Sequence, residues 1–386
     1  MERICYGCFR GTLNSRETCD LCGFDEKKNR EDFPLALPAG SILYGRYTIG
    51  KVLGQGGFGI TYLAQDYQTK KLYAIKEFYP DGMATRVGGT TVTPFSGEKG
   101  ENFAYGKLSF LDEAKTMAEF CDHPNIVDIL MYFEENNTAY FVMEYLNGSS
   151  FLDYIKSQGG RITFEEAIAI MDPVLDALST IHAKGIIHRD VTPDNIIITN
   201  DGTVKLLDFG AARHSLGNVS RSLDVILKHG FAPKEQYSRR GRQGSYTDVY
   251  SASATLYYAI TGHKPDDAIE RVDEDNLPYP SSLGAKITPA QEDALLKGME
   301  VRAENRYQTA AELRSALTGN EMLIPIPTPI PTPPPAQEPG TKGETGREVI
   351  AAHEEPAREF SGVKSEAIRE DPRKQPSKET EKRKRG

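Results

Sequence analysis

The stretch HRDVTPDN, residues 188 to 195, decides the fold of this chain. It places the carboxylate of Asp190 five positions before the amide of Asn195, and the motif DFG adds a second carboxylate at Asp208. The side-chain oxygens of Asn195 and Asp208 suit Mg²⁺, which prefers hard oxygen ligands. Asp190 would accept or orient the proton of an attacking hydroxyl group. Together the three residues predict a metal-assisted catalytic site.

A glycine-rich segment, GQGGFG, lies nearer the start of the chain, between two strand-like stretches. In a hairpin of this kind, backbone N–H groups can approach phosphate because no side chain stands in the way. Its place between two strands disfavours a dinucleotide-binding fold, in which the motif joins a strand to a helix. The candidate phosphate-binding residues are Gly54, Gln55, Gly56, Gly57, Phe58 and Gly59.

Three further segments carry groups that nucleotide binding needs. Lys76 ends AIK on the next expected strand, where its ammonium can reach the α- and β-phosphates. Glu113, in FLDEAKTMAEF, is the candidate carboxylate for orienting that lysine. In FVMEYLNG, Met143 would lie at the back of an adenine pocket, and backbone groups from Glu144 to Leu146 would bind adenine. Each residue alone fits an ordinary surface or core position, so the prediction depends on their shared order.

In this order and spacing, the motifs resemble those of the eukaryotic-like Ser/Thr protein kinases, in particular their bacterial soluble members, over residues 45 to about 317. FAPKEQY is similar to the end of the family's activation segment, and TDVYSASATLYYAITG is similar to its central helix. The resemblance implies an α+β, two-lobed protein-kinase fold, with a β-rich small lobe before a helical large lobe. It also implies transfer of the ATP γ-phosphate to Ser/Thr hydroxyls of protein substrates, with Mg²⁺ as cofactor.

The same resemblance assigns supporting roles in the large lobe. Asp248 would brace the catalytic loop, and Arg306 would pair with Glu235. Arg189 is the family's usual contact for a phosphorylated activation loop, so autophosphorylation is expected there. The available acceptors are Ser215, Ser220 and Ser222.

Thr192 departs from the family pattern, which has a lysine two positions after the catalytic aspartate. The family's substrate-docking loop normally carries a threonine seven positions before Glu235, and here that position is Lys228. The two residue types are exchanged. Lys228 could therefore bring its ammonium near the transferred phosphoryl group, with the Thr192 hydroxyl as its hydrogen-bond partner. The alternative is a solvent-facing Lys228 in a weaker enzyme.

A second departure is an insertion over residues 78–103. Its segment ATRVGGTTV has β-prone arms around Gly88 and Gly89, which predicts a hairpin. KEFYP…ATR is similar to a pattern in a bacterial subgroup of these kinases. The insertion could dock a substrate or regulate the Glu113 helix, and a surface hairpin without a function is an equal alternative.

Four of the five cysteines form two CxxC pairs near the amino terminus. Two such knuckles suit structural Zn²⁺, which four thiolates hold in a tetrahedron. Unligated cysteines or a redox pair are the alternatives, and the remaining cysteine, Cys121, is expected to be an ordinary buried thiol. No catalytic motif lies in this segment, so catalysis is expected to survive its deletion. The expected zinc ligands are Cys5, Cys8, Cys19 and Cys22.

Composition sets the remaining expectations. The 46 basic and 55 acidic residues give a net charge of -9, which argues against nucleic-acid binding as the main activity. The sequence shows neither a secretory signal nor an apolar run of transmembrane length, so we expect no membrane span and a cytoplasmic location. Four segments are expected: a zinc-ribbon-like module (1–30), a linker (31–44), the kinase domain (45–318), and a disordered Pro-rich, charged tail (319–386).

Two other classes of function fit parts of the sequence. A pseudokinase scaffold would explain Thr192, and a zinc-ribbon adaptor would use the cysteine segment and the tail to bind partners. A small-molecule kinase is disfavoured by the activation-segment ending at Pro233 to Glu235. ATP turnover that Asp208→Ala abolishes would distinguish an active kinase from both scaffolds.

Overall fold

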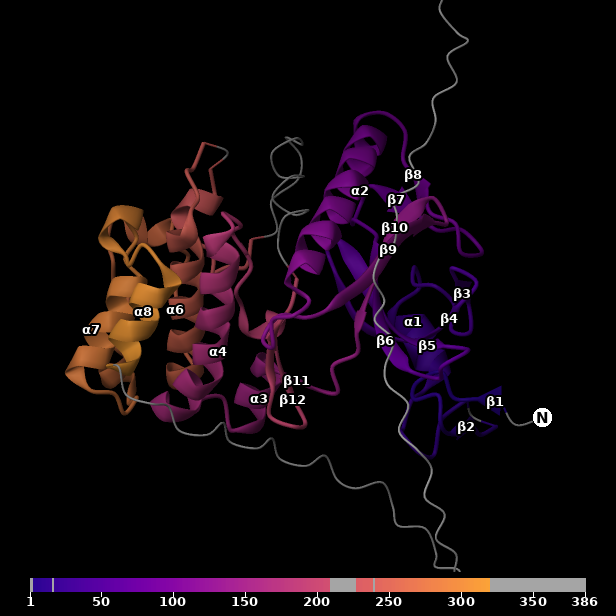
Figure 1. Cartoon of the computed structure of the whole chain (residues 1–386), viewed down its shortest axis with the longest axis horizontal. Helices are drawn as coiled ribbons and strands as arrows, with labels where there is room; N and C mark the ends of the chain where they lie inside the picture. The colour runs from indigo at the N-terminus through magenta and orange to yellow at the C-terminus, as the bar shows by residue number, and fades with distance from the viewer. Residues whose placement is uncertain (1–2, 16, 209–226, 239, 320–386) are drawn as a thin grey trace, which may run out of the picture. The chain divides into compact units, whose positions relative to one another are not determined.

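The computed structural model describes residues 3–15, 17–208, 227–238 and 240–319 (Figure 1). The small lobe is built on a six-stranded antiparallel sheet in the order β3-β4-β5-β6-β10-β9. Most positions of its central strands are buried, because both faces of the sheet are covered. Its strands are β3 (Ile42–Leu43), β4 (Tyr47–Gly56), β5 (Gly59–Asp66), β6 (Leu72–Phe78), β9 (Ile129–Glu135) and β10 (Thr138–Glu144).

Helix α2 (Glu98–Met117) contacts strands β9 and β10 of this sheet (Figure 1). Phe110 on the helix stacks on Phe141 of β10, with 4.8 Å between ring centroids. The helix begins at Glu98, inside the expected insertion, and carries Glu113. It ends in a short 3-10 helix, η1 (Ala118–Phe120).

The large lobe is helical, as the sequence predicts. Its central helix, α6, is formed by the segment that resembles the family's central helix, and almost all residues of α6 are buried. Capping boxes begin α4, α7 and α8, where a threonine side chain and a Glu or Gln three residues later satisfy the first amides. The helices are α3 (Phe151–Ser157), α4 (Phe164–Ala183), α6 (Ser245–Thr261), α7 (Pro289–Gly298) and α8 (Ala310–Thr318).

Short elements complete the large lobe. A three-stranded antiparallel sheet consists of β11 (Gly148–Ser150), β12 (Ile196–Thr199) and β13 (Val204–Leu206), and holds the segments on either side of the catalytic motifs. The 3-10 helices are η2 (Pro193–Asn195), η3 (Lys234–Gln236), η4 (Glu270–Val272), η5 (Pro280–Leu283) and η6 (Ala303–Asn305).

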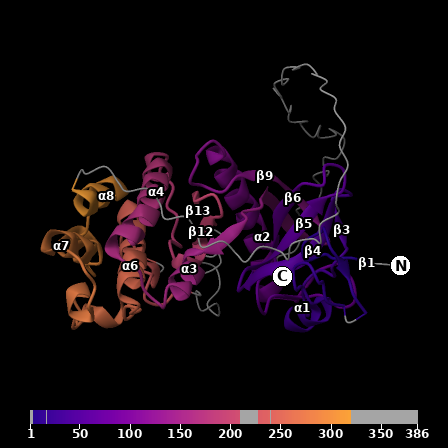
Figure 2. The same ribbon diagram turned by 90° about the horizontal axis from the view of Figure 1, so that it is seen from below.

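Residues 3–32, here called the cysteine module, contain β1 (Arg3–Ile4), β2 (Thr12–Leu13) and α1 (Glu26–Asp32). Helix α1 lies beside β4 and β5 in both views (Figures 1 and 2). The expected boundary at residue 30 falls inside this helix. The expected linker is also part of the folded lobe, because Leu37 and Leu43 are buried and β3 pairs with β4. Apolar side chains at these positions are more stable packed than in an open connection.

The insertion contains the expected hairpin, in which β7 (Ala84–Thr85) pairs with β8 (Thr93–Pro94) in antiparallel register. Arg86 leaves the hairpin and pairs with Glu77 of β6, whose carboxylate also accepts bonds from the Tyr62 and Tyr140 hydroxyls at 2.7 Å. Both members of the ion pair are buried. The insertion is therefore anchored to the small-lobe sheet.

Among the described residues, no helix is both long enough and apolar enough to cross a lipid bilayer.

Candidate active site

A cleft of about 480 Å³ opens between the glycine-rich hairpin, the strand β10 and the catalytic loop. Met143, Glu144, Tyr145 and Leu146 line it, which places the expected adenine-binding segment at the cleft. Sequence reasoning missed its apolar walls. The wall residues could have been found from the sequence, because each lies within three positions of a polar motif. They are Leu53, Ala74, Ile197 and Leu207.

The glycine-rich residues form the turn between β4 and β5. Added Cβ atoms at Gly54 and Gly56 would meet no neighbouring atom within 4 Å, so the hairpin leaves open space there. An added Cβ at Gly59 would lie 2.2 Å from the carbonyl oxygen of Glu77, so glycine at this position permits close strand contact. The insertion contacts the turn of this hairpin, since the Asp81 N–H donates to the Gly57 carbonyl oxygen at 2.9 Å.

Lys76, on β6, pairs with Asp208, which lines the cleft. Its Nζ lies 2.8 Å from Oδ2 of Asp208, so the structure joins two of the residues that the sequence singled out. The other carboxylate oxygen of Asp208, Oδ1, is buried and has no hydrogen-bond partner among the described residues. A buried oxygen of this kind can ligate a cation. Glu113 is buried on α2, and its pairing with Lys76 stays a prediction.

The catalytic loop is closed by Asn195. Its Nδ2 donates to the Asp190 backbone oxygen at 2.8 Å and to Asp190 Oδ2 at 2.7 Å. The helix η2 places Asn195 for both bonds, because Pro193 at its start fixes the turn. Asp190 is thereby oriented and almost fully buried, as a positioned general base requires.

Asp248, on α6, binds the backbone of the catalytic loop. Its carboxylate accepts the backbone N–H groups of His188 and Arg189 at 2.7 Å each, and His182 Nε2 lies 2.7 Å from Oδ2. Arg189 has a φ of 68°, an uncommon conformation for a non-glycine residue, which these bonds help to hold. The expected bracing role of Asp248 is confirmed. His182 was not foreseen, since a histidine inside a helix gives no distinct signal in the sequence.

His188 is fully buried, and its Nε2 lies 2.7 Å from the Leu207 carbonyl oxygen next to Asp208. Burial lowers the pKa of His188, although the carboxylate of Asp248 opposes the shift. A neutral imidazole can donate one hydrogen bond to that carbonyl. The side chain thus links the catalytic loop to the segment that carries Asp208.

The expected pair of Arg306 with Glu235 is confirmed. The guanidinium makes two bonds to the carboxylate, at 2.7 and 3.2 Å, and both side chains are buried. Arg306 Cζ also lies 4.9 Å from the ring centroid of Tyr250. A paired and buried charge of this kind fixes the end of the activation segment against α6.

Lys228 meets a different partner from the one expected. Its Nζ lies 3.4 Å from Oδ2 of Asp194, inside the catalytic loop. The Thr192 hydroxyl is buried and has no hydrogen-bond partner among the described residues, so the expected Thr192–Lys228 bond is not formed here. The lysine nevertheless docks on the catalytic loop, two residues beyond Thr192. Its role in catalysis stays a prediction.

Arg189 makes a side-chain hydrogen bond within the large lobe. Its Nε donates to Oε1 of Gln243 at 2.9 Å, and burial lowers the pKa of the guanidinium. The candidate phosphorylation sites Ser215, Ser220 and Ser222 lie outside the described residues, as do Phe209 and Gly210 of the DFG motif and the whole tail beyond residue 319.

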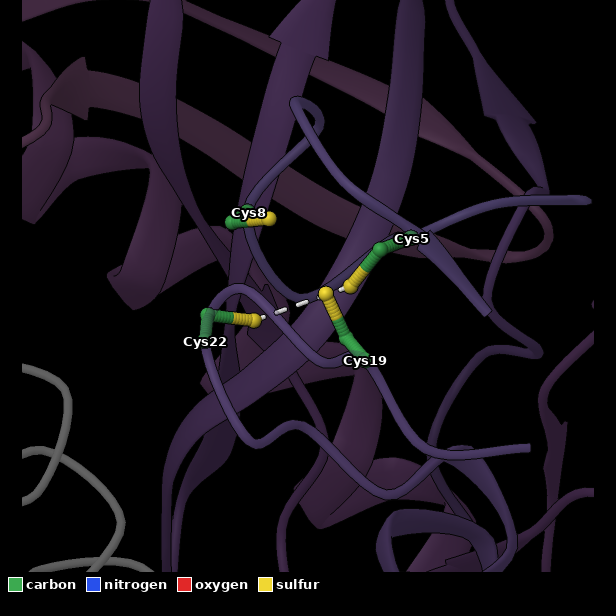
Figure 3. A group of neighbouring side chains, drawn as sticks. All are labelled: Cys5, Cys8, Cys19 and Cys22. Carbon is green, nitrogen blue, oxygen red and sulfur yellow. Dashed lines mark hydrogen bonds between the residues drawn. The ribbon is translucent and has the colours of Figure 1, made fainter. Parts of the chain in front are cut away.

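The four expected zinc ligands come together. Their sulfur atoms all lie within 4.8 Å of one another and are directed toward a common centre (Figure 3). The Cys5 and Cys22 sulfurs are 3.7 Å apart, close to the edge of about 3.8 Å in a tetrahedron with ~2.3 Å zinc–sulfur bonds. Backbone N–H groups of Gly7 and Gly11 donate to the sulfurs of Cys5 and Cys8.

The acid-base state of Cys8 also fits a ligand. Burial acts to raise the pKa of its thiol, but the backbone N–H groups of Gly11 and Arg10 and the neighbouring cysteines outweigh burial and lower the pKa to about 7. Burial raises the pKa of the Cys5 and Cys22 thiols, so Cys8 is the ligand of the three that ionises most readily. A thiolate is the form that binds metal. Cys121 lies apart, and burial raises the pKa of its thiol.

Comparison with known proteins gives a consistent result. The sequence profile described as "Protein kinase domain" matches residues 47–279. The chain is similar to a probable serine/threonine-protein kinase of Clostridium perfringens, with 31% identity over 71% of this chain and 38% of that protein. It is similar to serine/threonine-protein kinase D of Synechocystis, with 32% identity over 73% and 55% of the two chains. It is also similar to serine/threonine-protein kinase PknB of Mycolicibacterium smegmatis, with 34% identity over 71% and 43%.

A solved structure, "PpkA-294 apo form", superposes with a TM-score of 0.66 and 33% sequence identity, and the match covers 73% of this chain and 99% of that one. The matched region spans between 38% and 55% of the length of the three curated relatives.

Proposed function

The chain belongs to the protein kinase family, and from this premise we propose that it transfers the γ-phosphate of ATP to serine or threonine hydroxyls of protein substrates. The observation that carries the proposal is a set of two joined pairs, Lys76 with Asp208 and Asn195 with Asp190, of which Asp208 lines the cleft. The Leu207 N–H, next to Asp208, donates to the Asn195 carbonyl oxygen at 2.8 Å and connects the segments that carry the two pairs. Phosphoryl transfer depends on positioning and on neutralising charge, and these four side chains supply both.

Each residue has a distinct role in this proposal. Lys76 contacts the α- and β-phosphates after it exchanges its present partner, Asp208, for the nucleotide. Asn195 and Asp208 hold Mg²⁺, which fits the unpartnered buried Oδ1 of Asp208 and which, when bound, neutralises phosphate charge. Asp190, held by Asn195, orients the hydroxyl of the substrate and receives its proton.

The cleft also gives adenine a binding surface. Backbone groups of Glu144 to Leu146 are proposed to bind the base. Leu53 and Ile197 line the same cavity and would pack against the adenine ring. The Glu144 side chain is occupied elsewhere, because its Oε1 pairs with Lys205 Nζ at 2.7 Å. The Glu144 N–H is also occupied, because it donates to the Asp128 carbonyl oxygen at 3.1 Å, so the carbonyl group is the part of Glu144 that we propose binds the base.

The test uses the purified full-length chain, Mg²⁺, ATP labelled at the γ-phosphate, and a mixture of serine- and threonine-containing peptides. Labelled peptide should form, and Asp208→Ala and Asp190→Ala should each reduce the rate by about a hundredfold or more. Asp112→Ala, which removes an exposed carboxylate on α2, should leave the rate unchanged. If wild type transfers no phosphate but binds ATP, the chain is a pseudokinase scaffold, the function that the unpartnered Thr192 would favour.

We also propose that the cysteine module holds one structural Zn²⁺ through Cys5, Cys8, Cys19 and Cys22. Their convergence and the 3.7 Å sulfur separation support it. The module's own apolar cluster is small, consisting of Cys5, Leu13 and Cys19 with Cys8 and Phe24 beside it. Metal would therefore supply much of its folding free energy.

A further inference from the structure

The cysteine module contacts the strand that enters the glycine-rich hairpin. The Lys51 N–H donates to the Tyr6 carbonyl oxygen at 3.0 Å, and the Val52 N–H donates to Oδ1 of Asn29 at 3.1 Å. Both acceptors belong to the module, and both donors belong to β4. Two successive amides of the strand thus depend on a segment outside the matched kinase region, which begins at residue 47.

The strand needs these acceptors because its pairing with β5 is irregular there. The register shifts between Ile49 and Val52, and shifts again between Val52 and Gly54. Bulges leave backbone groups without their usual partners across the ladder. An unpaired N–H in a buried strand costs free energy, so an acceptor at this point fixes the path of the chain.

The contact is close enough to require glycine. An added Cβ at Gly50 would lie 2.3 Å from the Tyr6 carbonyl oxygen and 2.8 Å from Cε2 of Phe9. The three nearest atoms that it would meet, the Tyr6 carbonyl oxygen and Cε2 and Cζ of Phe9, all belong to the module. The absent side chain at residue 50 therefore serves the docking of the module.

One of the two held residues, Lys51, is also a residue of the nucleotide cleft. Lys51 and Leu53 both line the cavity, one on either side of Val52. Burial raises the pKa of Tyr145, and the positive charge of Arg10 opposes that shift, so Arg10 acts electrostatically on a residue between Glu144 and Leu146.

We propose that Asn29 and the Tyr6 carbonyl group are positioning elements for the glycine-rich hairpin, so that ATP affinity depends on the docked cysteine module. This inference rests on the proposed nucleotide site and adds a control over it. It adds to the sequence-based expectation that catalysis survives deletion of the module, because it predicts a loss of ATP affinity on the same deletion. Loss of docking should weaken nucleotide binding and leave the chemical step little changed, because the module's contacts with β4 lie at Gly50, Lys51 and Val52, outside the catalytic loop.

The test compares three substitutions on helix α1 and one on strand β4. Asn29→Ala removes the acceptor, Asn29→Asp retains an oxygen acceptor, and Glu31→Ala removes an exposed i,i+4 partner of Lys27 without touching β4. Gly50→Ala tests the same contact from the strand side. The readouts are the dissociation constant for ADP by calorimetry, KM for ATP and kcat for peptide phosphorylation, and amide exchange over residues 50–53.

Asn29→Ala should raise both the ADP dissociation constant and the ATP KM about two- to tenfold, the range expected for one lost hydrogen bond. The kcat should stay within about twofold, and exchange at residues 50–53 should accelerate. Asn29→Asp should recover most of the affinity, and Glu31→Ala should match wild type. Gly50→Ala should repeat the loss, and if that variant does not fold, Asn29→Ala decides alone.

The inference is overturned if folded Asn29→Ala binds ADP with wild-type affinity, or if Glu31→Ala weakens binding equally. A chain that shows the expected ADP effects but transfers no phosphate would instead contradict the proposed kinase activity. The two failures are therefore distinguishable.

Discussion

The ammonium of Lys228 lies 3.4 Å from the carboxylate of Asp194, which joins the segment after the activation loop to the catalytic loop. Both side chains are partly exposed, so the ion pair by itself contributes little stability. Its interest is its location. Asp194 precedes Asn195, a proposed metal ligand, and Lys228 is the residue that stands where the family has a threonine.

Lys228→Ala tests whether this lysine replaces the charge that Thr192 lacks. If it does, the rate of peptide phosphorylation should fall about 10²- to 10³-fold, as for loss of one preorganised donor. Asp194→Asn is the matched variant, because it breaks the ion pair and leaves the ammonium free. It should retain most of the activity. Equal losses in both variants would mean that the ion pair, rather than charge delivered to the phosphoryl group, is what matters.

The exchange of Thr192 and Lys228 can be tested directly. Thr192→Lys combined with Lys228→Thr should restore more activity than either single change leaves, because the pair would then have the family's usual arrangement. Such non-additivity is expected when two residues act as one unit. Steady-state rates of the two single variants and the double variant measure it. Simple multiplication of the single effects would contradict the coupling.

Phosphorylation of the activation segment is the third prediction. We expect autophosphorylation on at least one of Ser215, Ser220 and Ser222, because a phosphate there would gain charge-assisted bonds from Arg189. Replacing all three by alanine should lower activity toward an added peptide about fivefold or more. Mass spectrometry and peptide assays measure both effects. Full activity of the triple variant would assign Arg189 to its present bond with Gln243 alone.

Much of the kinase lobe architecture follows from sequence order, and the reasons are local. The glycine-rich hairpin, AIK and FVMEYL each carry their own strand pattern, and the structure has strands at all three. The ion pair of Arg306 with Glu235 could also be predicted from the sequence, because the resemblance identified both partners. Contacts that depend on how closely two segments distant in the sequence approach each other could not be predicted. The approach of Tyr6 to Gly50 is one, since an absent side chain leaves no pattern.

The buried ion pair of Glu77 with Arg86 is a further example. Alternation along β6 places Glu77 on the opposite face from Lys76, but only the folded insertion shows what meets it there. The ion pair gives the insertion a structural role, and its expected roles in substrate docking or in regulation of the Glu113 helix stay predictions. A hairpin tied through a buried carboxylate to Tyr62 and Tyr140 forms part of the small-lobe structure.

Arg86→Ala should therefore destabilise the protein strongly. It leaves the Glu77 carboxylate buried without its cation, which typically costs about 3–5 kcal/mol of unfolding free energy. Lys107→Ala is the control, because it breaks an ion pair with Glu134 at the lobe surface and should cost about 1 kcal/mol or less. Urea denaturation of both variants measures the difference. Similar losses would show that the Glu77 site relaxes or admits water.

The buried His188 predicts a pH dependence of stability. Burial holds its pKa below the ordinary value of 6.5, so the unfolded chain takes up a proton as pH falls through 6.5 while the folded chain does not. The unfolding free energy should therefore decrease as pH falls below about 6.5, down to the folded-state pKa. His188→Gln removes this contribution, so its stability should fall less than that of wild type between pH 7 and pH 5.5. Parallel pH curves for the two proteins would contradict the assignment.

Zinc binding by the cysteine module is the last prediction, and the chain offers its own control. Elemental analysis of a fresh preparation should give about one zinc per chain. Cys5→Ser and Cys19→Ser remove buried ligands and should abolish that zinc, whereas Cys121→Ser should retain it because Cys121 lies outside the cluster. Loss of metal should also expose residues 3–32 to limited proteolysis, since zinc would supply much of their folding free energy. Because this segment holds the amides of Lys51 and Val52, the zinc-free variants should weaken ADP binding in the same sense as Asn29→Ala. A metal-free wild-type protein in which residues 3–32 resist protease would exclude the zinc site while leaving the docking contact intact.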